Sequence, residues 1–160
     1  MSAQLDLFGR GEPHFDPTFA DAQRIELSHD AWLELVPHWL RGHQALFDAL
    51  LLHTQFHQER RLMYEKMLEV PRLYAVLGDD GPIPAVVQAM QETLSARYGE
   101  EFSRISLGYY RDGRDSVAFH GDRIARTLPR ALVATVSLGA PRRFLLKPNG
   151  GGKSLGFWLG

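Results

Sequence analysis

Residues 109–122 read YYRDGRDSVAFHGD. Two tyrosines, the turn-forming pair Asp112-Gly113 and the run 116–119 predict a strand, a tight turn and a second strand. His120 and Asp122 follow at the end of this second strand, where residues i and i+2 point to the same face. They match two of the three ligands of an iron(II) site built from two histidines and one carboxylate. An H-x-D tripeptide alone also fits an ordinary surface pair.

Further elements are predicted on both sides of this stretch. Pro84 in a first turn and Gly99 as a stop signal predict a helix over 84–98. Two more helices are expected, one beginning at Ser28 and ending at Pro37, the other over 42–53, and Pro71 is expected to interrupt the chain. The remaining candidates are short strands at 24–27, 73–77, 105–110, 132–138, 144–146 and 154–160. Helices followed by many short strands indicate an α+β fold with a sheet barrel or sandwich as its core.

Composition places the chain among ordinary globular proteins. Its 160 residues are the size of one domain, and 44% are hydrophobic. We expect residues 1–20 to form an irregular arm and residues 21–160 a single domain. No run reaches the about 18 apolar residues of a membrane span, and the start lacks the pattern of a signal peptide. The absence of cysteine excludes disulfides and thiolate metal sites, so we expect a cytoplasmic protein without membrane or disulfide partners.

Charge is distributed unevenly along the chain. Residues 1–100 carry 8 basic and 15 acidic side chains, whereas residues 101–160 carry 10 basic and 4 acidic ones. Most of the basic residues are arginine, whose planar donor groups suit phosphate and carboxylate. A basic segment in a nearly neutral chain fits an anionic partner such as nucleic acid or a dicarboxylate, and it also fits a solvated surface.

Residues 55–160 resemble the AlkB-like iron(II)- and 2-oxoglutarate-dependent dioxygenases, which repair alkylated nucleic acids. The shared motifs are Y-x-x-G at 110–113, H-x-D at 120–122 and V-S-L-G at 136–139. Further upstream, Met63-Tyr64 and Val70-Pro71-Arg72 resemble the family's nucleotide-recognition segment and the strand after it. The resemblance implies a double-stranded β-helix, or jelly roll, with flanking N-terminal helices.

The resemblance also implies roles for individual residues. His120 and Asp122 would ligate Fe(II), Tyr110 would contact 2-oxoglutarate, and Met63 and Tyr64 would help to hold an extruded base. Arg143, just after the V-S-L-G motif, would approach the substrate. The implied reaction uses O2 and 2-oxoglutarate to dealkylate N-alkylated bases in DNA or RNA, with a single-stranded substrate and a monomeric enzyme expected.

The sequence departs from the family pattern at several places. Gly108 replaces an asparagine that contacts 2-oxoglutarate, and we expect the jelly roll to be incomplete because the chain ends before the family's distal histidine ligand. Two smaller departures are Leu77, where the family has a tyrosine, and Arg123 or Ile124, where an acidic residue often follows H-x-D. His53 and His57 are substitutes only by residue type. Two alternatives therefore stay open: an inactive fragment or metal-free nucleic-acid-binding module, and an oxygenase acting on a protein or small molecule.

Three other motifs have simpler interpretations. Residues 150–154 read GGGKS, but the first glycine of a phosphate-binding loop is missing, and a hairpin turn is the better prediction. His53 and His57 have the i, i+4 spacing of zinc ligands on a helix, yet they also fit a solvated helix end. Asp112 and Asp115 resemble paired carboxylates, although turn formation and ion pairs with the adjacent arginines are the stronger prediction.

Overall fold

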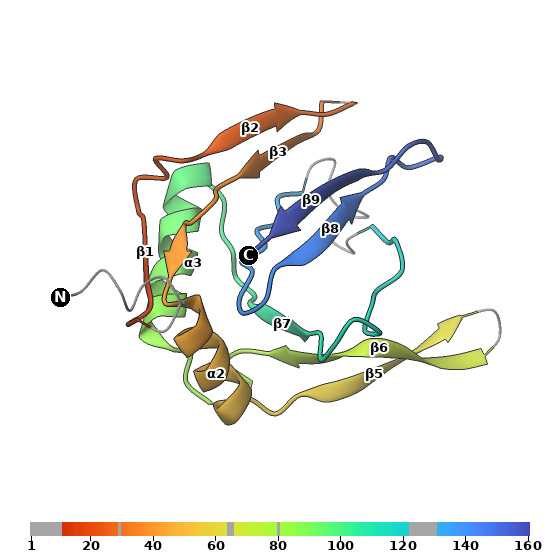
Figure 1. Ribbon diagram of the computed structural model, residues 1–160, viewed down its shortest axis with the longest axis horizontal. Helices are drawn as coiled ribbons and strands as arrows, with labels where there is room; N and C mark the ends of the chain where they lie inside the picture. The colour runs from red at the N-terminus through yellow and green to blue at the C-terminus, as the bar shows by residue number, and fades with distance from the viewer. Residues whose placement is uncertain (1–10, 29, 64–65, 80, 122–130) are drawn as a thin grey trace. The chain divides into compact units, whose positions relative to one another are not determined.

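The computed structural model describes residues 11–28, 30–63, 66–79, 81–121 and 131–160, and the side chains of these residues outside 61–68. The described part contains two helices and short antiparallel strands (Figure 1), so the fold is a mixture of helix and sheet, and no closed barrel is seen within it. Contacts divide the chain into two compact units, one of residues 1–51 with 134–160 and the other of residues 52–133. None of the described helices is both long and apolar enough to cross a membrane.

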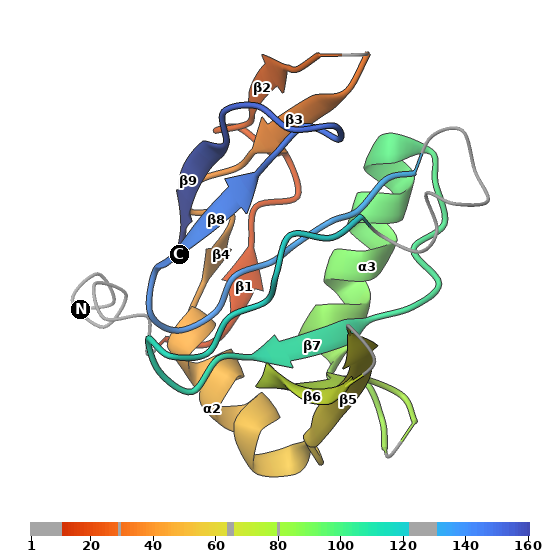
Figure 2. The same cartoon turned by 90° about the vertical axis from the view of Figure 1, so that its right-hand side faces the viewer.

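The first unit consists of three antiparallel strand pairs and most of a helix. Strand β1 (His14–Phe15) pairs with β4 (Leu40–Arg41), β2 (Gln23–Glu26) with β3 (Trp32–Leu35), and β8 (Arg142–Leu146) with β9 (Leu155–Leu159). The β8–β9 hairpin is clear in Figure 2. Helix α2 (His43–His53) follows β4 and confirms the helix predicted over 42–53. The buried core of this unit contains five apolar side chains: Phe19, Trp39, Leu40, Leu46 and Leu50.

The helix predicted to begin at Ser28 is wrong, because β2 and β3 pair as antiparallel strands on either side of this residue. Glu26 pairs with Trp32, and the Leu27 N–H donates to the carbonyl of Ala31 over 2.8 Å. Asp30 adopts a left-handed φ of 58°, which a hairpin turn accommodates and a helix does not. The cap signal at Ser28 therefore marks a turn, and of the expected N-terminal helices only α2 is present in the described residues.

The second unit contains a three-stranded antiparallel sheet and one helix. The strand order is β5 (His57–Met63), β6 (Lys66–Val76) and β7 (Ser106–Tyr109), with the longest strand in the centre. Figure 1 shows β5 and β6 side by side as two separate strands, and the two pair antiparallel. Helix α3 (Ala85–Tyr98) joins β6 to β7; it begins after Pro84 and ends at Gly99 in the left-handed conformation, as predicted. Val87 and Met90 are its buried residues.

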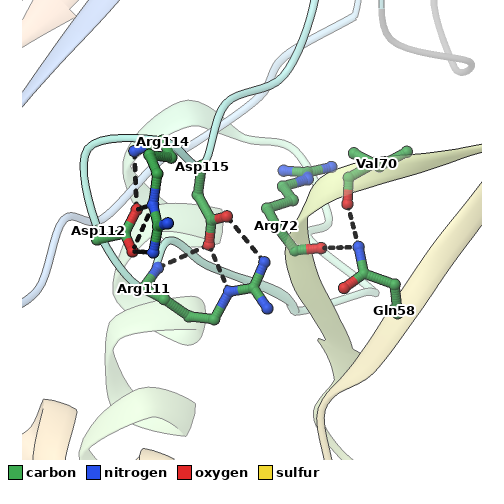
Figure 3. A network of polar contacts seen from close by, with 7 residues as sticks. All are labelled: Gln58, Val70, Arg72, Arg111, Asp112, Arg114 and Asp115. Carbon is green, nitrogen blue, oxygen red and sulfur yellow. Dashed lines mark hydrogen bonds and ion pairs between the residues drawn. The ribbon is translucent and has the colours of Figure 1, made fainter.

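Pro71 does not interrupt the chain as expected, because it lies inside β6 at an irregularity of the sheet. The β5–β6 register shifts between Gln58 and Arg60, so the proline falls where the ladder is already broken. The Gln58 side-chain amide donates to the carbonyls of Val70 and Arg72 at this point (Figure 3). These side-chain hydrogen bonds replace ladder bonds that the irregularity removes.

Two predicted strands, at 116–119 and 132–138, are not strands in the structure. The first makes one backbone bond to the sheet, from the Ser116 N–H to the carbonyl of Pro71 at 2.8 Å. Alternating hydrophobicity produces a strand only where a neighbouring strand completes the ladder, and among the described residues neither stretch forms one. The strands predicted at 24–27, 73–77, 105–110, 144–146 and 154–160 correspond to β2, β6, β7, β8 and β9.

Candidate active site

The segment that carries the predicted site begins where β7 ends and is held by a buried carboxylate. Asp115 exposes 5% of its surface and accepts three bonds from Arg111: the backbone N–H at 2.8 Å, Nε at 2.7 Å and Nη2 at 2.8 Å (Figure 3). Both carboxylate oxygens are therefore bound by one residue in a bidentate arrangement. This pair closes the turn that leads from Tyr110 towards His120.

A second, exposed pair lies within the same turn. The carboxylate of Asp112 accepts the backbone N–H of Arg114 at 2.8 Å and its Nη2 at 2.8 Å, while the Asp112 carbonyl accepts the N–H of Asp115. The prediction that Asp112 and Asp115 form the turn and pair with arginines is confirmed. Neither carboxylate is therefore available as a catalytic acid or base.

Hydrogen bonding lowers the pKa of both carboxyl groups. The side-chain bonds from Arg111, followed by its backbone N–H, lower the pKa of Asp115 from 3.8 to about 2. The side chain of Arg114 and then its backbone N–H lower the pKa of Asp112 as well. Donors to a carboxylate stabilise its charged form, so both groups are ionised at neutral pH.

His120 lies beyond this turn with a fixed imidazole. Its Nδ1 is 2.7 Å from the carbonyl oxygen of Ala118, and the side chain is exposed. A carbonyl oxygen only accepts, so Nδ1 carries the proton and the lone pair is on Nε2. Histidines that ligate metals commonly donate their other ring N–H to a carbonyl in this way, and the orientation of His120 therefore fits a metal ligand. His14 makes a similar bond to Glu12 at 3.0 Å, so this geometry is not unique to His120.

The rest of the predicted metal site is beyond what the structure describes. Asp122, predicted as the carboxylate ligand, lies outside the described residues. Among those that are described, no group of three His, Asp or Glu side chains is arranged to hold a metal ion. His120 thus fits a ligand by its tautomer, and Asp122 by the chemistry of its carboxylate.

The other predicted site residues are distributed over both units. Tyr110 follows β7 and lies near Arg72 of β6, whose Nη1 donates to the tyrosine hydroxyl at 3.4 Å. Met63 ends β5, but its side chain is not among those described, and Tyr64 lies outside the described residues. Arg143 belongs to the other unit, where it is an exposed residue of β8 opposite Trp158.

The competing motifs have structural explanations. His53 is the last residue of α2 and His57 the first residue of β5, so the two do not share a helix, and both are exposed. The glycines at 150–152 have positive φ angles of 89°, 105° and 115° and connect β8 to β9. The hairpin prediction for this glycine-rich segment is therefore confirmed.

Arg72 lies beside the predicted site residue Tyr110, and the sequence alone gives it no role apart from Val70 and Pro71. Its guanidinium lies 6.0 Å from the centroid of the Tyr110 ring, and Nε is buried without a hydrogen-bond partner among the described residues. The only sequence signal was the Gly108 departure, because glycine leaves space on the neighbouring strand.

Comparison with curated proteins gives a partial match. No family model matches the sequence. The human (Homo sapiens) DNA oxidative demethylase ALKBH2 is 28% identical over 98 residues, which cover 53% of this chain and 38% of the human protein. The match therefore spans well under half of the length of this relative. It indicates a distant and partial relationship with an AlkB-like protein, consistent with the motifs at 110–113, 120–122 and 136–139.

Proposed function

We propose that this chain takes part in oxidative dealkylation of N-alkylated nucleic-acid bases as an iron(II)- and 2-oxoglutarate-dependent dioxygenase with a jelly-roll fold. The observation that carries the proposal is the match to a DNA oxidative demethylase. The fixed tautomer of His120 adds a physical reason, because it directs a lone pair on Nε2 away from the backbone carbonyl. The basic balance of residues 101–160 supports a polyanionic substrate.

In this proposal the chain's own residues hold three components. His120 and Asp122 hold the iron, Tyr110 contacts 2-oxoglutarate, and Met63, Tyr64 and Arg143 contact the substrate. When bound, iron with O2 and 2-oxoglutarate supplies hydroxylation of the alkyl carbon, and the products are succinate, CO2, an aldehyde and the free base. The turn closed by Arg111 and Asp115 orients Tyr110 and His120 for these roles.

The test is demethylation of a single-stranded oligonucleotide that carries 1-methyladenine, followed by mass spectrometry. We expect loss of the methyl group to depend on Fe(II) and 2-oxoglutarate. His120→Ala should abolish it, whereas His14→Ala should not, because His14 is an exposed histidine with the same type of carbonyl bond.

Other outcomes identify the alternatives. Salt-dependent binding of single-stranded DNA without iron uptake or turnover would contradict the enzymatic proposal and favour a binding module. Consumption of 2-oxoglutarate without demethylation would instead favour an oxygenase that acts on a protein or small molecule. Activity that survives His120→Ala would remove the proposed iron site.

A further inference from the structure

Arg72 differs from Arg60, Arg111 and Arg114 because it has no carboxylate partner among the described residues. Arg60, Arg111 and Arg114 each pair with an acidic side chain at 2.7 to 2.9 Å. Arg72 forms no ion pair with any residue that the structure describes, and its Nε is buried without an acceptor. Its side-chain hydrogen bond to the Tyr110 hydroxyl is long, at 3.4 Å.

Partial burial of the Arg72 guanidinium without a counter-charge among the described residues destabilises the ligand-free protein. A guanidinium is charged at every physiological pH, and removing it from water without a counter-charge is unfavourable. The face of the Tyr110 ring offsets part of this cost through its electron-rich surface. An anion that accepted hydrogen bonds from the unpartnered donors would offset the remainder.

The neighbouring strand leaves room for this guanidinium. Gly108 of β7 pairs with Tyr74 of β6, two residues along the strand from Arg72. A Cβ atom at Gly108 would lie 3.0 Å from Arg72 Nη1 and 3.5 Å from Cε2 of Tyr110. Any side chain at this position would therefore press on the Arg72–Tyr110 pair.

The backbone beneath Arg72 is also fixed. The Gln58 amide donates to the carbonyls of Val70 and Arg72 across the irregular part of the β5–β6 ladder. The N–H of Ser116, which follows β7 in the chain, also donates a hydrogen bond to the carbonyl of Pro71. Arg72 is thus presented from a braced strand rather than from a mobile loop, as a preorganised binding group requires.

We propose that the Arg72 guanidinium, together with the Tyr110 hydroxyl, binds a carboxylate group of a small oxoacid. This inference rests on the proposed function, which places 2-oxoglutarate at Tyr110. The guanidinium donors match the two oxygens of a carboxylate, and the tyrosine hydroxyl donates one further hydrogen bond. Gly108 is the residue that makes the space for this pair.

The experiment measures binding of 2-oxoglutarate, and separately of succinate, to the 160-residue chain by calorimetry. We expect Arg72→Gln to weaken binding by about tenfold or more, as loss of charge-assisted hydrogen bonds predicts. Arg72→Lys keeps the charge but loses the planar donor pair. Its affinity for 2-oxoglutarate should therefore lie between those of the wild type and Arg72→Gln. Arg60→Gln is the matched control, an exposed arginine of the same sheet, and it should bind like the wild type.

A second readout separates ligand binding from a purely structural role. The Nε–H resonance of Arg72 in a ¹⁵N NMR spectrum, assigned by its loss in Arg72→Lys, should shift when 2-oxoglutarate is added. A structural strut against Tyr110 would leave this resonance unmoved by the ligand. Circular dichroism checks that each variant is folded, and if Arg72→Gln is not, Arg72→Lys and the wild-type resonance still decide.

The outcomes distinguish this inference from the function on which it rests. Equal affinity of Arg72→Gln and Arg60→Gln, or no binding by the folded wild type, would overturn the role of Arg72. The demethylation assay tests the proposed function independently of this result. Arg72-dependent binding without any demethylation would leave the carboxylate site standing and contradict the demethylase.

Discussion

Arg111 and Arg72 lie in the same unit of the chain and serve opposite purposes. Arg111 is paired with a buried carboxylate through three hydrogen bonds, two of them from its guanidinium, and it holds a turn. Arg72 contacts Tyr110 and forms no ion pair with the described residues. The arginines of this unit therefore do not form one functional surface: Arg111 holds a turn as a structural clamp, and Arg72 is the one that we propose for ligand binding.

Breaking the Arg111–Asp115 pair should have the largest effect on stability. Asp115→Asn removes the charge that Arg111 binds and leaves a guanidinium beside a neutral amide in a site that exposes only 5% of Asp115. We expect the melting temperature to fall by roughly 5 °C or more, measured by differential scanning calorimetry. Asp112→Asn is the control; its partner Arg114 is 91% exposed, so the change should be much smaller. Equal effects would mean that Asp115 is not a clamp.

The same comparison predicts an acid-sensitive stability. Bonds from Arg111 lower the pKa of Asp115 to about 2 in the folded chain, against an ordinary value of 3.8. A carboxylate with a lowered pKa stabilises the fold above its unfolded value, and this contribution is lost as pH falls through the folded value. Urea unfolding between pH 5 and pH 2 should therefore show a decline between about pH 4 and pH 2.

Part of this decline belongs to Asp112, whose pKa is lowered by Arg114. Asp115→Asn should flatten the curve more than Asp112→Asn does, because the Asp115 carboxylate is the buried one. A curve for Asp115→Asn with the wild-type slope would contradict the assignment of the acid response to this residue.

Filling the space at Gly108 should have the smallest effect on stability, and it tests whether Arg72 binds a ligand. Gly108→Ala places a Cβ 3.0 Å from Nη1 of Arg72, the far end of a flexible side chain that can move away. We expect the free energy of unfolding to change little, while affinity for 2-oxoglutarate falls by roughly threefold. Gly113→Ala is the control, since nothing lies within 4 Å of its added Cβ. Unchanged affinity in Gly108→Ala would argue against a ligand at Arg72.

The elements that could be predicted from the sequence are those set by a few consecutive residues. Pro84 and Gly99 mark the ends of α3, the apolar spacing over 42–53 gives α2, and the glycines at 150–152 give the β8–β9 turn. Each of these depends on backbone preferences of a few consecutive residues, so no distant contact is needed to decide them. The pairing of Asp112 and Asp115 with arginines was predictable for the same reason.

Tertiary contacts decided the rest. The signal at Ser28 fits a helix cap or a turn, and pairing of β2 with β3 chooses the turn. Pro71 continues a strand because the ladder is irregular there, whereas 132–138 forms none because the described residues supply no partner. Local preference is weak compared with the free energy of completing a sheet, which depends on residues far away in the sequence.

The candidate site likewise has residues that the sequence predicts and one that only the structure reveals. The H-x-D motif names His120 and Asp122 by residue type and spacing, on the expectation of a strand that the described residues 116–121 do not form. At Gly108 the sequence shows only that a side chain is missing. The fold brings Arg72, 36 positions earlier, beside that glycine through the β6–β7 register. A donor supplied across strands has no local signal, so only the tertiary structure reveals it.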